Sequence, residues 1–167
     1  ININYFESTK TNILKYMKLL SDNYSYIFLH YSGHGTFIND NNNDEPDYQD
    51  ECILPSDYLS SGIITDDIMK KEFINNLSDN TQCRIIMDCC NSGTLFDLQF
   101  RNNKKISNYD CKADVVAISG CRDDQLSYEA VINNKVQGAL TYNIDKVIKN
   151  KINNLTDIYM ILNNEFQ

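Results

Sequence analysis

The chain of 167 residues is long enough for one domain with a hydrophobic core, and 42% hydrophobic with 23% charged residues is typical of globular proteins. Its formal net charge of −8 argues against a surface that binds nucleic acid, and favours a cationic partner or a bound metal. No apolar stretch approaches the length of a membrane span, so we expect no membrane partner.

The six cysteines include no CxxC pair and no cysteine–histidine spacing typical of zinc fingers. A chain of this length folds without disulfides, so we expect reduced thiols and a cytoplasmic location. We also expect the protein to be a monomer.

The first half of the chain predicts two strands and one helix before a long loop. A short strand at residues 1–5 precedes a helix at about 11–21, capped by Ser8 or Thr9. The apolar and aromatic run 26–31 predicts a buried strand. Residues 36–51 are polar, rich in Asn and Asp and aperiodic, so we expect a loop there.

A short strand at 52–54 follows, and then a helix that Thr65 caps and that runs to about Leu77. Residues 84–88 and 114–120 predict two more buried strands, separated by a basic, exposed linker at 102–110. Helices at about 139–150 and 156–166 complete the predicted elements.

Strands alternating with helices, with the strands continuously apolar, indicate an α/β sandwich with a mostly parallel sheet and helices on both faces. Ligand sites in such sheets form at the carboxyl ends of the strands. The three buried strands end at residues 32–35, 88–93 and 119–121, where the sequence becomes polar and contains glycine. We therefore expect the functional groups at one edge of the sheet.

Histidine and cysteine side chains at two of these strand ends suggest thiol chemistry. A thiol attacks a carbonyl well only as thiolate, and so it needs a nearby base such as histidine. His30 lies inside a predicted strand, whereas His34 follows it, between two glycines. The N–H of Gly35, together with that of the nucleophile, is suited to stabilise an oxyanion.

The motifs YSGHGT at 31–36 and DCCNSG at 88–93 resemble those of the metacaspases, in the caspase-like clan of cysteine peptidases. The resemblance extends through GIITDD at 62–67 and SGCRDDQ at 119–125, and it covers nearly all of the chain. It implies a three-layer caspase-like sandwich with His34 as the base. It also implies that Cys90 is the nucleophile, and not Cys89.

By the same resemblance, the chain is a cysteine endopeptidase that cleaves protein or peptide substrates after Arg or Lys. The family's acidic substrate pocket corresponds to Ser32, Asp66 and Asp88, and a carboxylate there suits a guanidinium or ammonium group. The family's calcium ligands correspond to Asp50, Asp66, Asp67 and Asp97, whose hard oxygens suit that ion.

Resemblance to the family also divides the chain. Residues 1–100 correspond to the large-subunit part, 101–112 to a linker and 113–167 to the small-subunit part. Basic residues in and beside the linker are expected self-cleavage sites for a peptidase of this specificity: Arg101, Lys104 and Lys105. We expect the family's first core strand and its last strand to have no counterpart in these residues.

Several of these assignments have a simpler alternative. Asp66 and Asp67 suit the first turn of a helix, Asp88 could merely satisfy nearby backbone donors, and the basic linker residues could be only a solvated surface. The family has histidine after the nucleophile, where this chain has Asn91. A catalytically impaired regulatory or scaffolding module, or an acidic calcium-binding domain, is therefore the alternative to an active peptidase.

Overall fold

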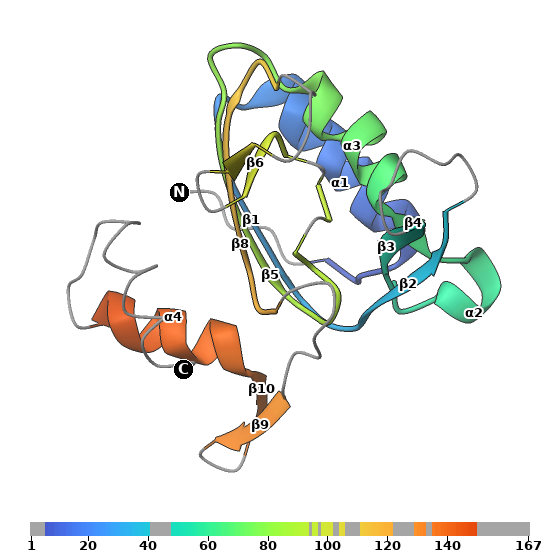
Figure 1. Ribbon diagram of the computed structural model, residues 1–167, viewed down its shortest axis with the longest axis vertical. Coiled ribbons are helices and arrows are strands. Elements are labelled where there is room, and N and C mark those ends of the chain that lie inside the picture. Colours follow the sequence, from blue (N-terminus) through green and yellow to red (C-terminus); the bar gives the residue numbers. More distant parts are fainter. Residues whose placement is uncertain are drawn as a thin grey trace.

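The computed structural model describes residues 6–40, 48–93, 95–96, 98–101, 104–105, 111–121, 129–132 and 135–149. At its centre is a parallel three-stranded sheet in the order β1-β5-β8 (Figure 1). These strands span Tyr26–Ser32, Gln82–Asp88 and Asp114–Ser119. Because neighbouring strands are parallel, with Ser32 opposite Asp88 and Met87 opposite Ser119, all three end at one edge.

Helices cover both faces of this sheet. α1 (Lys10–Asn23) and α3 (Asp66–Glu72) lie together on one side, and α4 (Ala139–Lys149) lies on the other (Figure 1). Side chains of β5 alternate accordingly: Ile85 and Met87 join the core with α1 and α3, whereas Ile86 packs against α4. The predicted α/β sandwich with a mostly parallel central sheet is confirmed.

Threonines begin both helices of the first face, as the sequence predicts. Thr9 Oγ1 accepts a hydrogen bond from the backbone N of Asn12, and Thr65 Oγ1 accepts one from that of Ile68, both at 3.4 Å. Each bond satisfies one of the N–H groups that the first helical turn leaves unpaired. α3 is shorter than expected, because it ends at Glu72 and a 3₁₀ turn follows at η1 (Ile74–Asn76).

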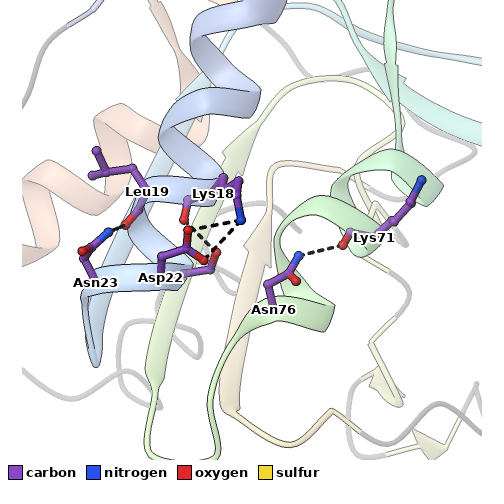
Figure 2. Close-up of polar contacts among 7 residues, drawn as sticks. Lys18, Leu19, Asp22, Asn23, Lys71 and Asn76 are labelled. Atoms are coloured by element: carbon purple, nitrogen blue, oxygen red, sulfur yellow. Dashed lines mark hydrogen bonds and ion pairs between the residues drawn. The ribbon is translucent and has the colours of Figure 1, made fainter.

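Asparagine side chains satisfy carbonyl groups at the other ends of these helices (Figure 2). Asn23 Nδ2 donates to the carbonyl of Leu19 at 2.9 Å, and Asn76 Nδ2 donates to that of Lys71 at 2.8 Å. Lys71 lies in the last turn of α3, where carbonyls have no intrahelical partners, whereas Leu19 lies one turn before the end of α1. Part of the chain's abundant asparagine therefore stabilises helix ends.

The expected loop at 36–51 is wrong over much of its length. Gly35–Asn39 forms β2 and Gln49–Ile53 forms β3, and they pair with β4 (Ile64–Thr65) in an antiparallel sheet of order β2-β3-β4. The reason is tertiary, since β3 carries Cys52 and Ile53 into the core at 0% and 1% exposure and supplies partners for β2. Residues 41–47 lie outside the described residues.

Other short elements were also not expected. They are α2 (Tyr58–Ser61), a hairpin of β6 (Phe100–Arg101) with β7 (Lys104–Lys105), and a hairpin of β9 (Glu129–Ile132) with β10 (Lys135–Gly138). The first hairpin overlaps the expected linker at 101–112, whose role as a linker stays a prediction. The strand at 1–5 and the helix at 156–166 lie outside the described residues. Over the ranges given above, no helix is long and apolar enough to cross a membrane.

Candidate active site

Two of the expected functional segments meet directly at the carboxyl edge of the parallel sheet. Ser32 and Asp88 are opposite each other in the register of β1 and β5, and the N–H beyond Ser32, that of Gly33, donates to the Asp88 carbonyl at 3.3 Å. Ser119, at the end of β8, donates through Oγ to the carbonyl of Ser92 at 2.7 Å. The prediction that the three strand ends gather at one edge is confirmed.

Gly35 brings the turn after β1 against the backbone of Cys90. A Cβ at Gly35 would overlap the carbonyl oxygen of Cys90 and lie 3.2 Å from Cys89 Sγ, so glycine is required there. The turn is held from the other side by Tyr31, whose hydroxyl lies 3.0 Å from the His34 carbonyl and 3.2 Å from that of Leu54. Residues 34 and 35 are therefore fixed beside Cys90, with the His34 side chain exposed.

The ladder between β2 and β3 sets the direction of the Gly35 N–H. Leu54 N donates to the His34 carbonyl at 3.0 Å, so these two residues form a hydrogen-bonded pair. Antiparallel pairs alternate, so Gly35 and Ile53 form a non-hydrogen-bonded pair and the Gly35 N–H points away from β3. Among the described strands, β2 lies at the edge of its sheet, so this N–H points off that edge; its role as an oxyanion donor stays a prediction.

The two adjacent cysteines lie in different environments. Cys89 is 1% exposed, and burial raises the pKa of its thiol to about 12. Its carbonyl accepts hydrogen bonds from Ser92 Oγ at 2.9 Å and from Cys121 Sγ at 3.2 Å. Cys90 is only half-buried. A thiol that stays protonated far above neutral pH is a poor nucleophile, so of the two Cys90 suits that role. None of the six cysteines, all of which lie in the described ranges, forms a disulfide.

Asn91, where this chain departs from the family pattern, has a left-handed backbone with φ of 48°. Asn and His are among the few residues that adopt this conformation at little cost. Asn91 is 8% exposed and therefore part of the packed strand end. The backbone at this position thus accommodates Asn in place of His.

Asp88 is 3% exposed and is bound to the start of α4. Its Oδ2 accepts from the backbone N of Thr141 at 2.7 Å and from Thr141 Oγ1 at 2.6 Å. A Cβ at Gly138 would overlap the same oxygen. Asp88 therefore satisfies a backbone donor, as the simpler alternative predicts. It also lies at the strand end, opposite Ser32 in the register.

His30 joins this group through Thr141, since its Nε2 lies 3.0 Å from Thr141 Oγ1. Sequence reasoning missed His30, Thr141 and Gly138 as neighbours of Asp88. His30 and Ser32 are two positions apart and so lie on one face of β1. Only this spacing could have suggested that His30 lies near Asp88. The contact with α4 joins residues far apart in the sequence, so no local pattern indicates it.

Asp66 is the first residue of α3 and directly follows β4. It is 2% exposed, and its Oδ2 accepts from Glu51 N at 3.1 Å while its Oδ1 accepts from Asp67 N at 2.8 Å. Both oxygens thus bind backbone donors around the helix start. This is the arrangement that the simpler alternative for Asp66 describes, and its place in a substrate pocket stays a prediction.

The expected calcium ligands are only partly described. Asp50 is 7% exposed on β3, Asp67 is half-buried, and Asp97 lies outside the described residues. In the part of the chain that the structure describes, no three His, Cys, Asp or Glu side chains come together so as to hold a metal ion. With both Asp66 oxygens already bound to N–H groups, the described residues alone do not form a calcium site.

The expected self-cleavage residues lie in the β6–β7 hairpin. Arg101 ends β6, and Lys104 and Lys105 form β7 with exposed side chains. Exposed basic side chains agree equally with a solvated surface and with a cleavable segment, so both readings stay open.

Comparison with known proteins adds independent information. A family model described as "Metacaspase, peptidase C14 domain" matches residues 2–99. Metacaspase-1 of Plasmodium falciparum is 34% identical over 163 residues, which cover 91% of this chain and 26% of that protein. Inactive metacaspase-4 of Trypanosoma brucei brucei is 32% identical over 136 residues, covering 71% of this chain and 38% of that protein.

Structural comparison agrees on the fold. A solved protein of Geobacter sulfurreducens superimposes with a TM-score of 0.65 and 24% identity, over 88% of this chain and 64% of that one. This chain spans less than half the length of the two metacaspases above. With the family match over more than half of its residues, the chain belongs to the metacaspase family of cysteine peptidases.

Proposed function

We propose that the chain is the catalytic domain of a cysteine endopeptidase that cleaves after Arg or Lys, with His34 as base and Cys90 as nucleophile. The observation that supports this proposal is the close approach of Gly35, the neighbour of His34, to the backbone of Cys90. Membership of the metacaspase family supports the same chemistry.

The reaction has two stages. His34 takes the thiol proton of Cys90, and the thiolate attacks the substrate carbonyl, forming a tetrahedral intermediate whose oxyanion is stabilised by the N–H groups of Gly35 and Cys90. The intermediate collapses, His34 protonates the departing amine, and a thioester remains. Water, deprotonated by His34, then hydrolyses the thioester and releases the acid and the free thiol.

Selection of basic residues rests on the strand-end carboxylate. Asp88 and Ser32 lie side by side at the end of the sheet that also carries the thiol, and a buried carboxylate attracts a guanidinium or ammonium group. Asp66 remains a candidate for the same pocket by family resemblance. An acidic substrate side chain would be repelled there.

Cleavage of a fluorogenic peptide with Arg before the reporter, compared with its Asp counterpart, tests the proposal. We expect the wild-type chain to cleave only the Arg peptide, Cys90→Ala to cleave neither, and Cys89→Ala to retain cleavage. Full activity of Cys90→Ala would exclude Cys90 as the nucleophile. Cleavage of the Asp peptide would exclude the acidic pocket.

We propose calcium stimulation as a second property, with Asp50, Asp66, Asp67 and Asp97 as the ligands that the family resemblance implies. Hard carboxylate oxygens and the net charge of −8 favour such a cation. Calorimetric titration of calcium into wild-type and Asp97→Asn chains, beside activity with and without the ion, is the measurement. Equal binding by both chains would remove Asp97 from the site.

Self-processing in the β6–β7 hairpin is a third proposal, supported by the exposure of Lys104 and Lys105. Mass spectrometry of the incubated chain should find cleavage after Arg101, Lys104 or Lys105 in the wild type and none in Cys90→Ala. Identical fragments from both chains would mean that another peptidase makes the cut.

A non-catalytic scaffold is the second candidate function, because Asn91 replaces the family's histidine and one of the relatives is named an inactive metacaspase. Labelling with an Arg-directed electrophile in the presence of calcium separates the two functions. A scaffold leaves Cys90 unlabelled, whereas a peptidase is labelled there in proportion to its activity.

A further inference from the structure

The start of α4 is held by a side chain from another element. Thr141 is the third residue of the helix, a position whose N–H is usually satisfied by the side chain of the residue before the helix. That residue is Gly138, which has no side chain. Asp88 of β5 provides the missing acceptor, and glycine at 138 leaves room for its carboxylate to approach.

Thr141 gives the same carboxylate oxygen a second hydrogen bond. Its backbone N and its Oγ1 both donate to Asp88 Oδ2, at 2.7 and 2.6 Å. A carboxylate oxygen has two lone-pair sites, so the two hydrogen bonds from Thr141 suffice to occupy both sites of Oδ2. Any further donor that approaches Oδ2 competes with Thr141.

His30 determines the direction of the Thr141 hydroxyl. The hydroxyl has one proton, which it gives to Asp88, and so it accepts from His30 Nε2 at 3.0 Å. His30 therefore has a proton on Nε2, and the three side chains form a directed relay from His30 through Thr141 to Asp88. Although part of the His30 side chain is exposed, desolvation lowers its pKa against the opposing effect of Asp88, which favours the neutral ring near neutral pH.

The relay lies at the position where the substrate's basic side chain would bind. His30 and Ser32 share one face of β1, and their partners in the register of β5 are Ile86 and Asp88. α4 packs on this face through Leu140 and Ile144, next to Ile86. The start of α4, the His30 ring and the Asp88 carboxylate thus lie together on this face of the sheet.

We propose that Thr141, oriented by His30, is a specificity-determining positioning residue that keeps Asp88 from binding a basic side chain through both carboxylate oxygens. This inference rests on the proposed function of Asp88. An arginine gains its advantage over lysine from a two-pronged contact with both oxygens, whereas an ammonium group binds as a point charge. With Oδ2 occupied by Thr141, arginine loses that advantage and the site accepts Arg and Lys on similar terms.

The test compares kcat/KM for two peptides that differ only in Arg or Lys at the cleaved bond. Thr141→Val keeps the shape and the backbone donor but removes the hydroxyl, and so it frees one site on Oδ2. We expect the Arg-to-Lys ratio to rise about threefold to tenfold, the worth of one hydrogen bond. Thr141→Ser restores the hydroxyl and should restore the wild-type ratio.

A merely structural role for Thr141 would lower cleavage of both peptides together and leave their ratio unchanged. Thermal melting of each variant separates this loss of folded protein from a change in selectivity. A Thr141→Val ratio equal to that of the wild type and of Thr141→Ser would overturn the inference. So would a ratio that moves toward Lys.

The relay also has a spectroscopic signature that does not depend on cleavage. The chain has two histidines, so nitrogen-15 spectra of the imidazole rings can assign each one. We expect His30 to hold its proton on Nε2 in the wild type and in Thr141→Ser, and to lose this preference in Thr141→Val. A His30 proton on Nδ1 in the wild type would overturn the relay.

Failure of this inference and failure of the proposed function give different results. If the wild-type chain cleaves neither basic peptide, the proposed function falls and the selectivity role falls with it. If the wild type cleaves both, but the ratio is the same in all three chains, only the role of Thr141 is overturned.

Discussion

Substitution of Gly35 by alanine tests the arrangement on which the proposed chemistry depends. The new Cβ would overlap the Cys90 carbonyl oxygen, which is backbone and cannot rotate away. Relief of the overlap requires the histidine-bearing turn and the cysteine loop to move apart by about 1 Å. A displacement of that size costs on the order of 100-fold in rate when reacting groups must be aligned. Overpacking adds about 1–3 kcal/mol of lost stability.

Gly62→Ala is the matched control. Gly62 has φ of 79°, so alanine there is strained by about 1–3 kcal/mol, yet the nearest atom to the new Cβ is Lys10 Nζ at 3.6 Å. Both variants should lose similar stability. The assay is kcat/KM for the Arg peptide, at a temperature where melting curves show both chains folded. A Gly35→Ala chain as active as Gly62→Ala would refute the reasoning.

Three further predictions follow from the thiols and the strand-end turn. Burial raises the pKa values of Cys52, Cys83 and Cys89 to about 11, 12 and 12. The unfolded chain releases these protons first, near pH 9, so the contribution of these thiols to stability should be constant below that pH. Above pH 9, the free energy of unfolding should fall by roughly 1.4 kcal/mol per thiol for each pH unit, which a falling midpoint of urea unfolding would show. A midpoint that stays constant to pH 10.5 would contradict the burial of these thiols. Iodoacetamide at pH 7.5 should alkylate Cys90 but not Cys89 in the folded chain, by peptide mapping, and equal labelling would contradict their different environments. Asn91→Val should cost about 1–3 kcal/mol of stability, because valine rarely adopts the left-handed backbone of this position. Asn91→His should melt like the wild type. Equal melting temperatures of both variants would contradict a left-handed backbone at residue 91.

Much of the fold could be predicted because its information is local. The apolar runs at β1, β5 and β8 have the length and composition of buried strands, and Thr9 and Thr65 precede helices as caps. β2 and β3 could not be predicted in the same way. They flank a segment that is polar and rich in Asn and Asp, and they become strands because each supplies the other's hydrogen bonds.

In the candidate site, too, local sequence predicted some features, and others needed the structure. Residue type and position after a strand sufficed to select His34, Gly35 and Cys90, because a thiol, an imidazole and a glycine turn have few other reasons to occur at strand ends. The contrast between Cys89 and Cys90 needed the structure. Both are cysteines in one short motif, and only the deeper burial of Cys89 distinguishes their thiols.

The sequence by itself determined the fold class, the family motifs and the two strand ends that bear His34 and Cys90, because hydrophobic runs and motif residues are properties of neighbouring positions. Tertiary structure alone decided the surroundings of Asp88. Thr141 lies 53 positions from Asp88 and 111 from His30 along the chain, and yet their side chains meet. The physical reason is that β5 receives β1 on one edge and α4 on its outer face, so packing brings together groups that no local pattern connects.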